Sequence, residues 1–175
     1  NIQLTALKTK TQLTICRRIN PYSPSQEHLS FYSSKYYYPS NQMEVVHEEG
    51  DKEKIMCLFF NSTAFFAQFL THKEESTGRR VDIRVSDLVS MHGFDYNKLT
   101  KKDKKLLLRT FDEASTKEFP SIMNQYKNEH RLRRRIDEAI FEVIGLQKST
   151  IKRMLNDLYQ TIYEEMVRIR SFSRD

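Results

Sequence analysis

The predicted fold depends most on the run Lys54-Ile55-Met56-Cys57-Leu58-Phe59-Phe60 and on the Asn61-Ser62-Thr63 that directly follows it. The density of apolar residues predicts a helix that is buried on most sides, and Asp51 can serve as its N-cap. A hydroxyl group of Ser62 or Thr63 can accept a hydrogen bond from an exposed amide of a second helix, over residues 64–71. Exposed helix amides also attract anions, but we interpret Asn61-Ser62-Thr63 as the cap between two helices rather than as a nucleotide-binding site.

Short β-prone runs precede these helices, and turn formers such as Asn20-Pro21 and Pro39-Ser40-Asn41 separate the runs. This alternation predicts the strands of a small sheet. The predicted strands cover residues 12–16, 29–32, 35–38 and 43–46. The first part of the chain, residues 1–100, is therefore expected to mix α and β structure.

Beyond residue 100 the pattern is helical. One candidate helix covers residues 99–114 and another begins at Pro120. Apolar residues then recur at three- and four-residue intervals up to Gly145, which stands where a left-handed C-cap belongs. A final amphipathic stripe comprises Ile151, Met154, Leu155, Leu158, Ile162, Met166 and Ile169. We predict an α+β fold, in which a small mixed β-sheet with packed helices is followed by a helical part, residues 101–175, that ends in an antiparallel helical hairpin.

The composition permits a basic surface. The 175 residues include 29 Lys and Arg against 23 Asp and Glu, and the formal charge is +6. Such a charge suits phosphate binding, although many basic proteins bind no nucleic acid. Cys16 and Cys57 have no metal-type spacing, so we expect both to be buried thiols in a reducing compartment. The apolar stretches are too short to span a bilayer, which predicts a cytoplasmic protein with no membrane partner.

Several short motifs follow one another along most of the chain. In sequence order they are Phe31-Tyr32-Ser33-Ser34-Lys35, Leu58-Phe59-Phe60-Asn61-Ser62-Thr63, Gly78-Arg79-Arg80-Val81-Asp82-Ile83-Arg84-Val85-Ser86-Asp87-Leu88, Phe111-Asp112-Glu113, Glu118-Phe119-Pro120 and Arg134-Arg135-Ile136-Asp137-Glu138-Ala139-Ile140-Phe141-Glu142-Val143-Ile144-Gly145-Leu146. Their order resembles the C-terminal target-recognition region of adenine-specific (amino-group) DNA methyltransferases of restriction-modification systems. The resemblance implies a fragment that binds double-stranded DNA for an upstream methyltransferase catalytic domain, which would use S-adenosylmethionine and can be fused to a nuclease. A start at Asn1, without an initiator Met, agrees with a piece of a longer polypeptide.

The chain lacks the catalytic motifs of such enzymes, so any enzyme activity is expected of the parent polypeptide. Amino-group methyltransferases use an Asp/Asn-Pro-Pro-Tyr/Phe turn to hold the flipped base. Asn20-Pro21-Tyr22 lacks the second proline, and we interpret it as a β-turn. No glycine-bearing βα unit is available for S-adenosylmethionine, so we expect no cofactor in this fragment. Asp103-Lys104-Lys105 matches the acid-x-Lys pattern of nucleases but is interpreted as a solvated helix start.

The candidate DNA-binding residues are Lys35, Tyr36, Arg79, Arg80 and Arg84. A turn at Gly78 leads into the β-prone residues 80–85, where Arg80 and Arg84 would share one face of an extended strand and Ser86 or Asp87 would open a helical turn. Guanidinium groups there can bind guanine edges or phosphates, unless the run is only a solvated edge strand. Lys35 beside Tyr36-Tyr37-Tyr38 can contact phosphate and sugar, with Lys8, Lys10 and Arg17-Arg18 extending the patch, unless the strand merely packs with one tyrosine pointing outward.

The remaining basic cluster is not assigned to DNA binding, and a second function is possible for the whole chain. Arg131 and Arg133-Arg134-Arg135 fan around a helix, and we expect them to pair with acids such as Glu129, Asp137 and Glu138 rather than to clamp phosphates. The alternative function is a non-enzymatic protein-interaction module, whose C-terminal amphipathic helices dock a partner while the positive charge serves solubility.

Overall fold

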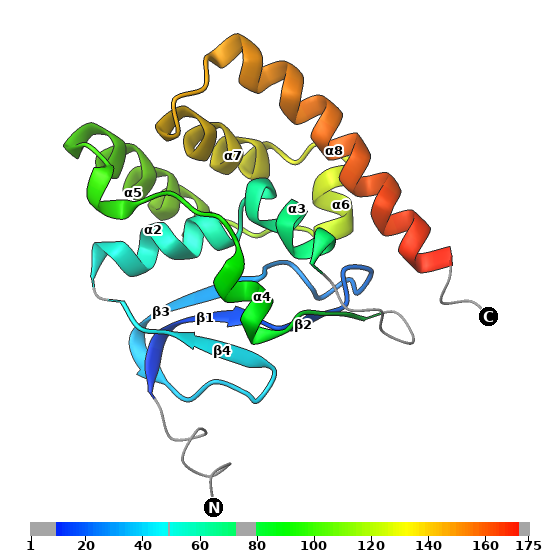
Figure 1. The fold of residues 1–175 in the computed structure, drawn as a ribbon, viewed down its shortest axis with the longest axis horizontal. Coiled ribbons are helices and arrows are strands. Elements are labelled where there is room, and N and C mark those ends of the chain that lie inside the picture. The colour runs from blue at the N-terminus through cyan, green and yellow to red at the C-terminus, as the bar shows by residue number, and fades with distance from the viewer. Residues whose placement is uncertain (1–9, 49, 73–79, 172–175) are drawn as a thin grey trace, which may run out of the picture.

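The computed structural model of the chain describes residues 10–48, 50–72 and 80–171. Figure 1 shows small sheets in the lower part of the molecule and helices stacked above them. This α+β architecture confirms the predicted fold class. One continuous cluster of buried side chains draws on residues from both sides of residue 100, and a domain boundary there stays a prediction.

The strands of the described residues form two antiparallel sheets, close to the predicted positions. β1 (Thr11–Cys16) lies between β3 (Ser30–Tyr37) and β4 (Met43–Val46), whereas β2 (Arg18–Ile19) pairs with β5 (Val81–Asp82). β1 is buried along almost its whole length because strands flank it on both edges. Since β3 and β4 both run antiparallel to β1, residues 38–42 carry the chain from one edge of the sheet to the other.

β3 unites two of the predicted strands into one. Leu13 lies opposite Tyr32 while Thr11 lies opposite Tyr37, so residues 33–36 of β3 face a single residue of β1 and form a bulge. The Ser33 hydroxyl accepts a hydrogen bond from the Lys35 amide at 3.1 Å inside this bulge. A bulge bends its strand and re-aims the side chains on it, and both Lys35 and Tyr36 are exposed here.

The helices cover the three-stranded sheet in layers. α2 packs on β1 and β3, α5 and α7 pack on α2, and α8 packs on α6 and α7. α7 and α8 form the predicted antiparallel hairpin at the top of Figure 1. The helices described are α2 (Asp51–Phe60), α3 (Thr63–Thr71), α4 (Val85–Ser90), α5 (Lys101–Ser115), α6 (Ile122–Lys127), α7 (Arg131–Val143) and α8 (Lys148–Ser171), with a short 3₁₀ turn η1 (Tyr96–Lys98) before α5.

Two predicted helix caps are confirmed. The Ser62 hydroxyl accepts a hydrogen bond from the Phe65 amide at 3.3 Å and so caps α3. Gly145, at φ 93°, ends α7 in the left-handed conformation that a residue without a Cβ adopts at little cost. Its amide donates to the Glu142 carbonyl at 3.0 Å and the Leu146 amide donates to the Phe141 carbonyl at 3.1 Å, which completes a Schellman motif.

Two other helix starts were predicted wrongly. Gly50, at φ 61°, occupies the N-cap of α2, and Asp51 is the first helical residue. The Asp51 carboxylate therefore acts on the positive end of the helix dipole instead of capping an amide. α4 begins at Val85 with Arg84 in the N-cap position, before the predicted Ser86 or Asp87.

A buried carboxylate, that of Asp137 in α7, joins three helices. It accepts hydrogen bonds from the Thr63 amide at 2.6 Å, from the Thr63 hydroxyl at 2.5 Å and from the Tyr159 hydroxyl of α8. Burial raises the pKa of the Asp137 carboxyl, while the nearby charge of Arg133 and the three donors oppose that rise. Because all three donors converge on one group, α3, α7 and α8 are fixed relative to one another.

Arg133 extends this network to the sheet. Its guanidinium is almost fully buried and donates to Gln125 Oε1 of α6 at 2.6 and 2.9 Å and to the Asn61 carbonyl. The Asn61 side chain accepts from the Leu29 amide at 2.8 Å and donates to the Ser30 carbonyl at 2.8 Å. Asn61-Ser62-Thr63 therefore is the cap that holds the fold together, as interpreted from the sequence.

Replacing Ile140 with Ala should lower the free energy of unfolding by about 2–5 kcal/mol, because the side chain is 1% exposed in the α7 and α8 core. The matched control is Ile144→Ala, the same chemical change one turn later at a side chain that is 51% exposed. That control should cost well under about 1 kcal/mol. Urea unfolding of both variants measures the difference, and equal losses would contradict the described packing of α7.

Replacing Asp137 with Ala should lower the free energy of unfolding by about 3–5 kcal/mol, because it leaves buried donors and the buried Arg133 charge uncompensated. Glu138→Ala removes the neighbouring carboxylate, which is exposed and lies 3.4 Å from Arg134. This control should cost at most about 1 kcal/mol. A Glu138 variant as unstable as the Asp137 variant would refute a special role for the buried network.

Candidate nucleic-acid interface

An open hollow of about 350 Å³ lies where the two sheets meet. It is lined by Arg17, Arg18, Asn41, Gln42, Asp82, Ile83 and Arg84. The chain follows β1 directly into β2, and β5 returns beside β2, so three arginines from two distant segments come together. From the sequence, Arg84 was assigned to the predicted strand 80–85, and Arg17-Arg18 to an extension of the Lys35 patch. That the three arginines lie together was not predicted.

Backbone and side-chain contacts hold Arg17 and Arg18 in place. The Arg17 carbonyl accepts a hydrogen bond from the Ile83 amide at 3.0 Å. The Nε atom of the Arg17 side chain lies 2.8 Å from Glu44 Oε1. Arg18 donates two parallel hydrogen bonds to Asp82, at 2.7 and 2.8 Å. Since both charges already have acidic partners, these arginines shape the hollow more than they add net positive charge to it.

The side-chain amides of Asn41 and Gln42 have open hydrogen-bonding capacity at this hollow. Both residues are exposed, and their side chains make no hydrogen bond to any described residue. Their backbone is nevertheless fixed, because the Gln42 carbonyl accepts from the Arg17 amide at 3.0 Å and the Asn41 carbonyl accepts from Arg17 Nη2 at 3.1 Å. The sequence interpretation treated Asn41 only as a turn former, because nothing local shows that Arg17 anchors it.

The predicted arginine strand is wrong in its extent. β5 ends at Asp82, since β2 offers only two residues to pair with, and Ile83 and Arg84 already lead into α4. Arg80 and Arg84 therefore do not share one strand face, although both are exposed. Arg84 instead faces the hollow beside Arg17 and Arg18. Gly78 and Arg79 lie outside the described residues.

Lys35 and Tyr36 lie in the β3 bulge, toward the opposite end of β1. Tyr36 is 65% and Tyr38 57% exposed, and Lys10 Nζ lies 5.5 Å from the Tyr38 ring centroid. These tyrosines do not merely pack within the sheet. Lys8 lies outside the described residues. Because Tyr37 lies opposite Thr11 whereas Arg17 follows the last residue of β1, the two predicted DNA-binding segments are roughly 20 Å apart along the strand.

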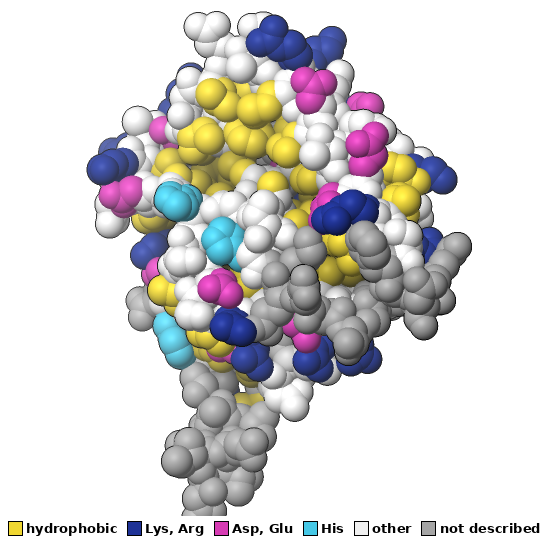
Figure 2. All heavy atoms as spheres, turned by 45° about the vertical axis from the view of Figure 1, so that its right-hand side comes forward, with side chains coloured by type: hydrophobic (Ala, Val, Ile, Leu, Met, Phe, Trp, Pro, Cys, Tyr) yellow, Lys and Arg dark blue, Asp and Glu magenta, His cyan; other side chains and the backbone are white. Residues whose placement is uncertain are grey.

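One face of the molecule carries an apolar area in its upper part (Figure 2). Figure 2 shows Lys and Arg side chains in the lower part of one face, where the sheets lie, and also at the rim of its upper part, with acidic side chains among them. Hydrophobic side chains gather on the upper part of the same face, over the helices.

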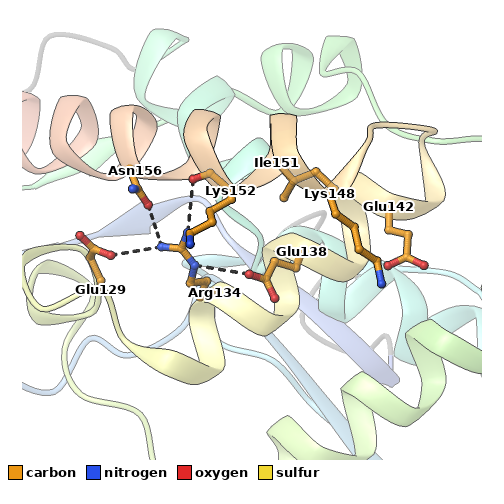
Figure 3. Close-up of a pocket in the computed structure, with 8 residues that line it drawn as sticks. All are labelled: Glu129, Arg134, Glu138, Glu142, Lys148, Ile151, Lys152 and Asn156. Carbon is orange, nitrogen blue, oxygen red and sulfur yellow. Dashed lines mark hydrogen bonds and ion pairs between the residues drawn. The ribbon is translucent and has the colours of Figure 1, made fainter.

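Two of the four arginines at the start of α7, Arg134 and Arg135, pair with acids as predicted, whereas Arg131 forms no ion pair with a described residue. Arg134 sits in a hollow of about 440 Å³ between α7 and α8 and reaches Glu129 at 3.1 Å, Glu138 at 3.4 Å and Asn156 at 2.9 Å (Figure 3). Arg135 pairs with Glu113 of α5. Arg133 differs from the prediction, because it is buried and binds Gln125 and a carbonyl rather than an acid. With its donors engaged, Arg134 serves to join the helices.

The Asn20-Pro21-Tyr22 segment is the predicted β-turn. The Ser23 amide donates to the Asn20 carbonyl at 2.9 Å, and the Tyr22 hydroxyl donates to the Met166 carbonyl of α8 at 2.8 Å. The turn thus ties α8 to the sheet region.

Cys16 and Cys57 are buried and free, and burial raises their thiol pKa values to about 11 and about 12. Within the described ranges, no three His, Cys, Asp or Glu side chains gather closely enough to hold a metal ion.

Comparison of the chain with protein-family models, with curated proteins and with solved structures gives no match. The resemblance to methyltransferase target-recognition regions therefore rests on the order of motifs alone. Among the described helices, none combines the length and the apolar character needed to cross a bilayer.

A smaller hollow, of about 200 Å³, lies between β3 and α5 beside His28. The His28 ring packs against Phe119, with ring centroids 4.8 Å apart, and against Phe31 at 6.1 Å. Burial, with a smaller effect from the Arg133 charge, lowers the pKa of His28 from 6.5 to about 4. Between these two pH values the unfolded chain binds a proton that the folded chain excludes, so the stability that neutral His28 contributes is complete above pH 6.5 and is lost as the pH falls toward 4.

His28→Gln should flatten the loss of stability on acidification between about pH 6.5 and pH 4, a contribution of at most about 3 kcal/mol. The control is His47→Gln, which changes an exposed histidine and should leave the pH dependence as in the wild type. Urea unfolding across this pH range measures both slopes. An unchanged slope in the His28 variant would show that this residue is not held neutral by the fold.

Proposed function

We propose that this chain is the target-recognition part of an adenine-specific DNA methyltransferase of a restriction-modification system, and that it binds double-stranded DNA. The observation that carries the proposal is the hollow where Arg17, Arg18 and Arg84 meet the amides of Asn41 and Gln42. Arginine and carboxamide side chains are the groups that pair bidentately with guanine and adenine edges in the major groove. The order of motifs along the chain supports the same reading.

In this proposal the two ends of β1 have different tasks. Lys35 and Tyr36 in the β3 bulge, with Lys10 beside Tyr38, contact phosphate and sugar and set the position of the duplex. Arg84, with Gln42, contacts base edges at the other end. Arg18 stays paired with Asp82, so that its guanidinium supports the wall of the hollow.

Methyl transfer belongs to an upstream catalytic domain that uses S-adenosylmethionine, and the proposed location of the whole enzyme is the cytoplasm. The turn most similar to a catalytic motif, Asn20-Pro21-Tyr22, has its tyrosine engaged: the hydroxyl binds Met166 and the Arg170 guanidinium lies 5.8 Å from the ring centroid. A tyrosine held in this way is not available to stack on a flipped base.

The apolar side chains of the helical part favour a second candidate, a protein-interaction module. Val167 of α8 is 42% and Ile144 is 51% exposed, and Met154 and Leu158 line a shallow hollow on α8. The hollow at Met154 and Leu158 can also serve the first proposal, by packing against the catalytic domain.

Gln42→Ala and Arg84→Ala should each weaken binding to a duplex enriched by the wild-type chain from a randomised pool, by about 1–3 kcal/mol, and should weaken binding to a scrambled duplex less. Arg153→Ala is the control, because Arg153 is an exposed arginine on α8. Fluorescence anisotropy measures both affinities for each variant.

Equal weakening on both duplexes would assign Gln42 and Arg84 to phosphate contact. No selective enrichment from the pool, together with no duplex binding, would reject the proposal in favour of the interaction module. Methyl transfer by this chain alone from labelled S-adenosylmethionine would contradict the assignment of catalysis to another domain.

A further inference from the structure

The first half of α5 carries a dense group of cations. Lys101, Lys102, Lys104, Lys105 and Arg109 fall within its first nine residues. The acid among them, Asp103, accepts hydrogen bonds from the Thr100 amide at 2.9 Å and from the Thr100 hydroxyl at 2.6 Å. Its carboxylate is therefore used in the capping box that starts the helix.

Exposed cations of α5 have no acidic partner among the described residues, unlike two of the arginines that line the hollow, and the same holds for Lys148, Lys152 and Arg153 of α8. Arg17, Arg18 and Arg134 all lie within ion-pair distance of a carboxylate. In contrast, within the described part of the chain no ion pair involves Lys101, Lys105 or Arg109. This face of α5 therefore has an unneutralised positive charge, whereas the hollow at the end of β1 is partly neutralised by its own acids.

The spacing of these cations makes a track. Lys101, Lys105 and Arg109 follow one another at four-residue intervals, so they lie on one face of the helix about 6 Å apart along its axis. They border a shallow depression of about 440 Å³ together with Lys104 and Leu108, and Asp112 closes its far end. A row of positive groups at one regular spacing matches a regularly charged backbone.

Local electrostatics on this part of the molecule is unfavourable in the absence of an anion. Lysines in the first turn of a helix oppose the positive end of its dipole. In addition, Lys104 Nζ lies 4.0 Å from the Tyr96 ring centroid, and Lys52 Nζ, which pairs with Glu48, lies 5.7 Å from it. A capping box and a cation-π contact stabilise a helix start whose charge pattern alone would weaken it.

We propose that the cationic face of α5, formed by Lys101, Lys105 and Arg109, binds the phosphate backbone of double-stranded DNA. The inference rests on the proposed function and adds a second contact surface outside the hollow. α5 is joined to the strand that carries Lys35, because Phe111 packs edge to face on Tyr32 with ring centroids 5.5 Å apart. A duplex that reaches the cationic face of α5 gains affinity there without sequence preference.

The test compares two triple variants that lose the same charge. Lys101→Gln, Lys105→Gln and Arg109→Gln are combined in one variant, and Lys148→Gln, Lys152→Gln and Arg153→Gln on α8 in the control. Binding of each to a mixed-sequence duplex is measured between about 50 and 200 mM salt. Removing three phosphate contacts should reduce the slope of log K against log salt by about 2 to 3, with the same loss for selected and scrambled duplexes. The control should keep a slope close to that of the wild type.

Three results would overturn the inference. A slope unchanged in the α5 variant, while the wild type binds duplex, removes α5 from the interface and leaves the proposed function intact. Equal effects of the α5 and α8 variants would assign the loss to net charge rather than to a surface. A wild-type chain that binds no duplex at about 50 mM salt overturns both the inference and the proposed function. Thermal unfolding of both variants, expected to match the wild type, shows that the exposed substitutions leave the fold in place.

Discussion

The contact between Asp137 and Thr63 is the constraint on which the arrangement of this molecule depends. A carboxylate inside a protein is stable only when donors surround it, and here the donors come from a helix start and from another helix. Arg133 next to it needs acceptors for the same reason and finds them on α6 and at Asn61. Each of these groups would be costly if a neighbouring element shifted, so the network selects one packing of the helices and one position of β3.

Around this rigid centre, the basic side chains at the end of β1 and those on α5 differ in their hydrogen-bond and ion-pair partners. At the end of β1, arginines are locked by acids and backbone carbonyls, while the amides of Asn41 and Gln42 keep their hydrogen-bonding capacity. On α5, Lys101, Lys105 and Arg109 form no ion pair with a described residue and follow the period of the helix. The first arrangement favours selective contacts of fixed geometry, and the second favours contacts that tolerate any sequence.

Sequence patterns predicted the elements better than their long-range partners. The strands, the Ser62 cap, the Gly145 stop and the helical hairpin depend on local spacing, which the sequence contains directly. The burial of Arg133 could not be predicted, because its acceptor Gln125 lies on another helix and Asn61 lies 72 residues earlier. The arginine strand was predicted too long because its extent depends on β2, a partner of two residues. Nothing in the sequence near Asn41 indicates that Arg17 holds it, so the amides of the hollow were missed.

Residues 38–42 leave β3 at one edge of the sheet and enter β4 at the other, passing from the level of Thr11 to that of Cys16. Five residues have little slack over that path, which is about 16 Å along β1 alone. An inserted or deleted residue would have to be absorbed by sliding β4 along β1 or by releasing Arg17 from its carbonyl acceptors. Natural variation in this segment is therefore expected to exchange side chains at positions 41 and 42 while keeping its length, so that ligand preference can diverge among related chains on an unaltered scaffold.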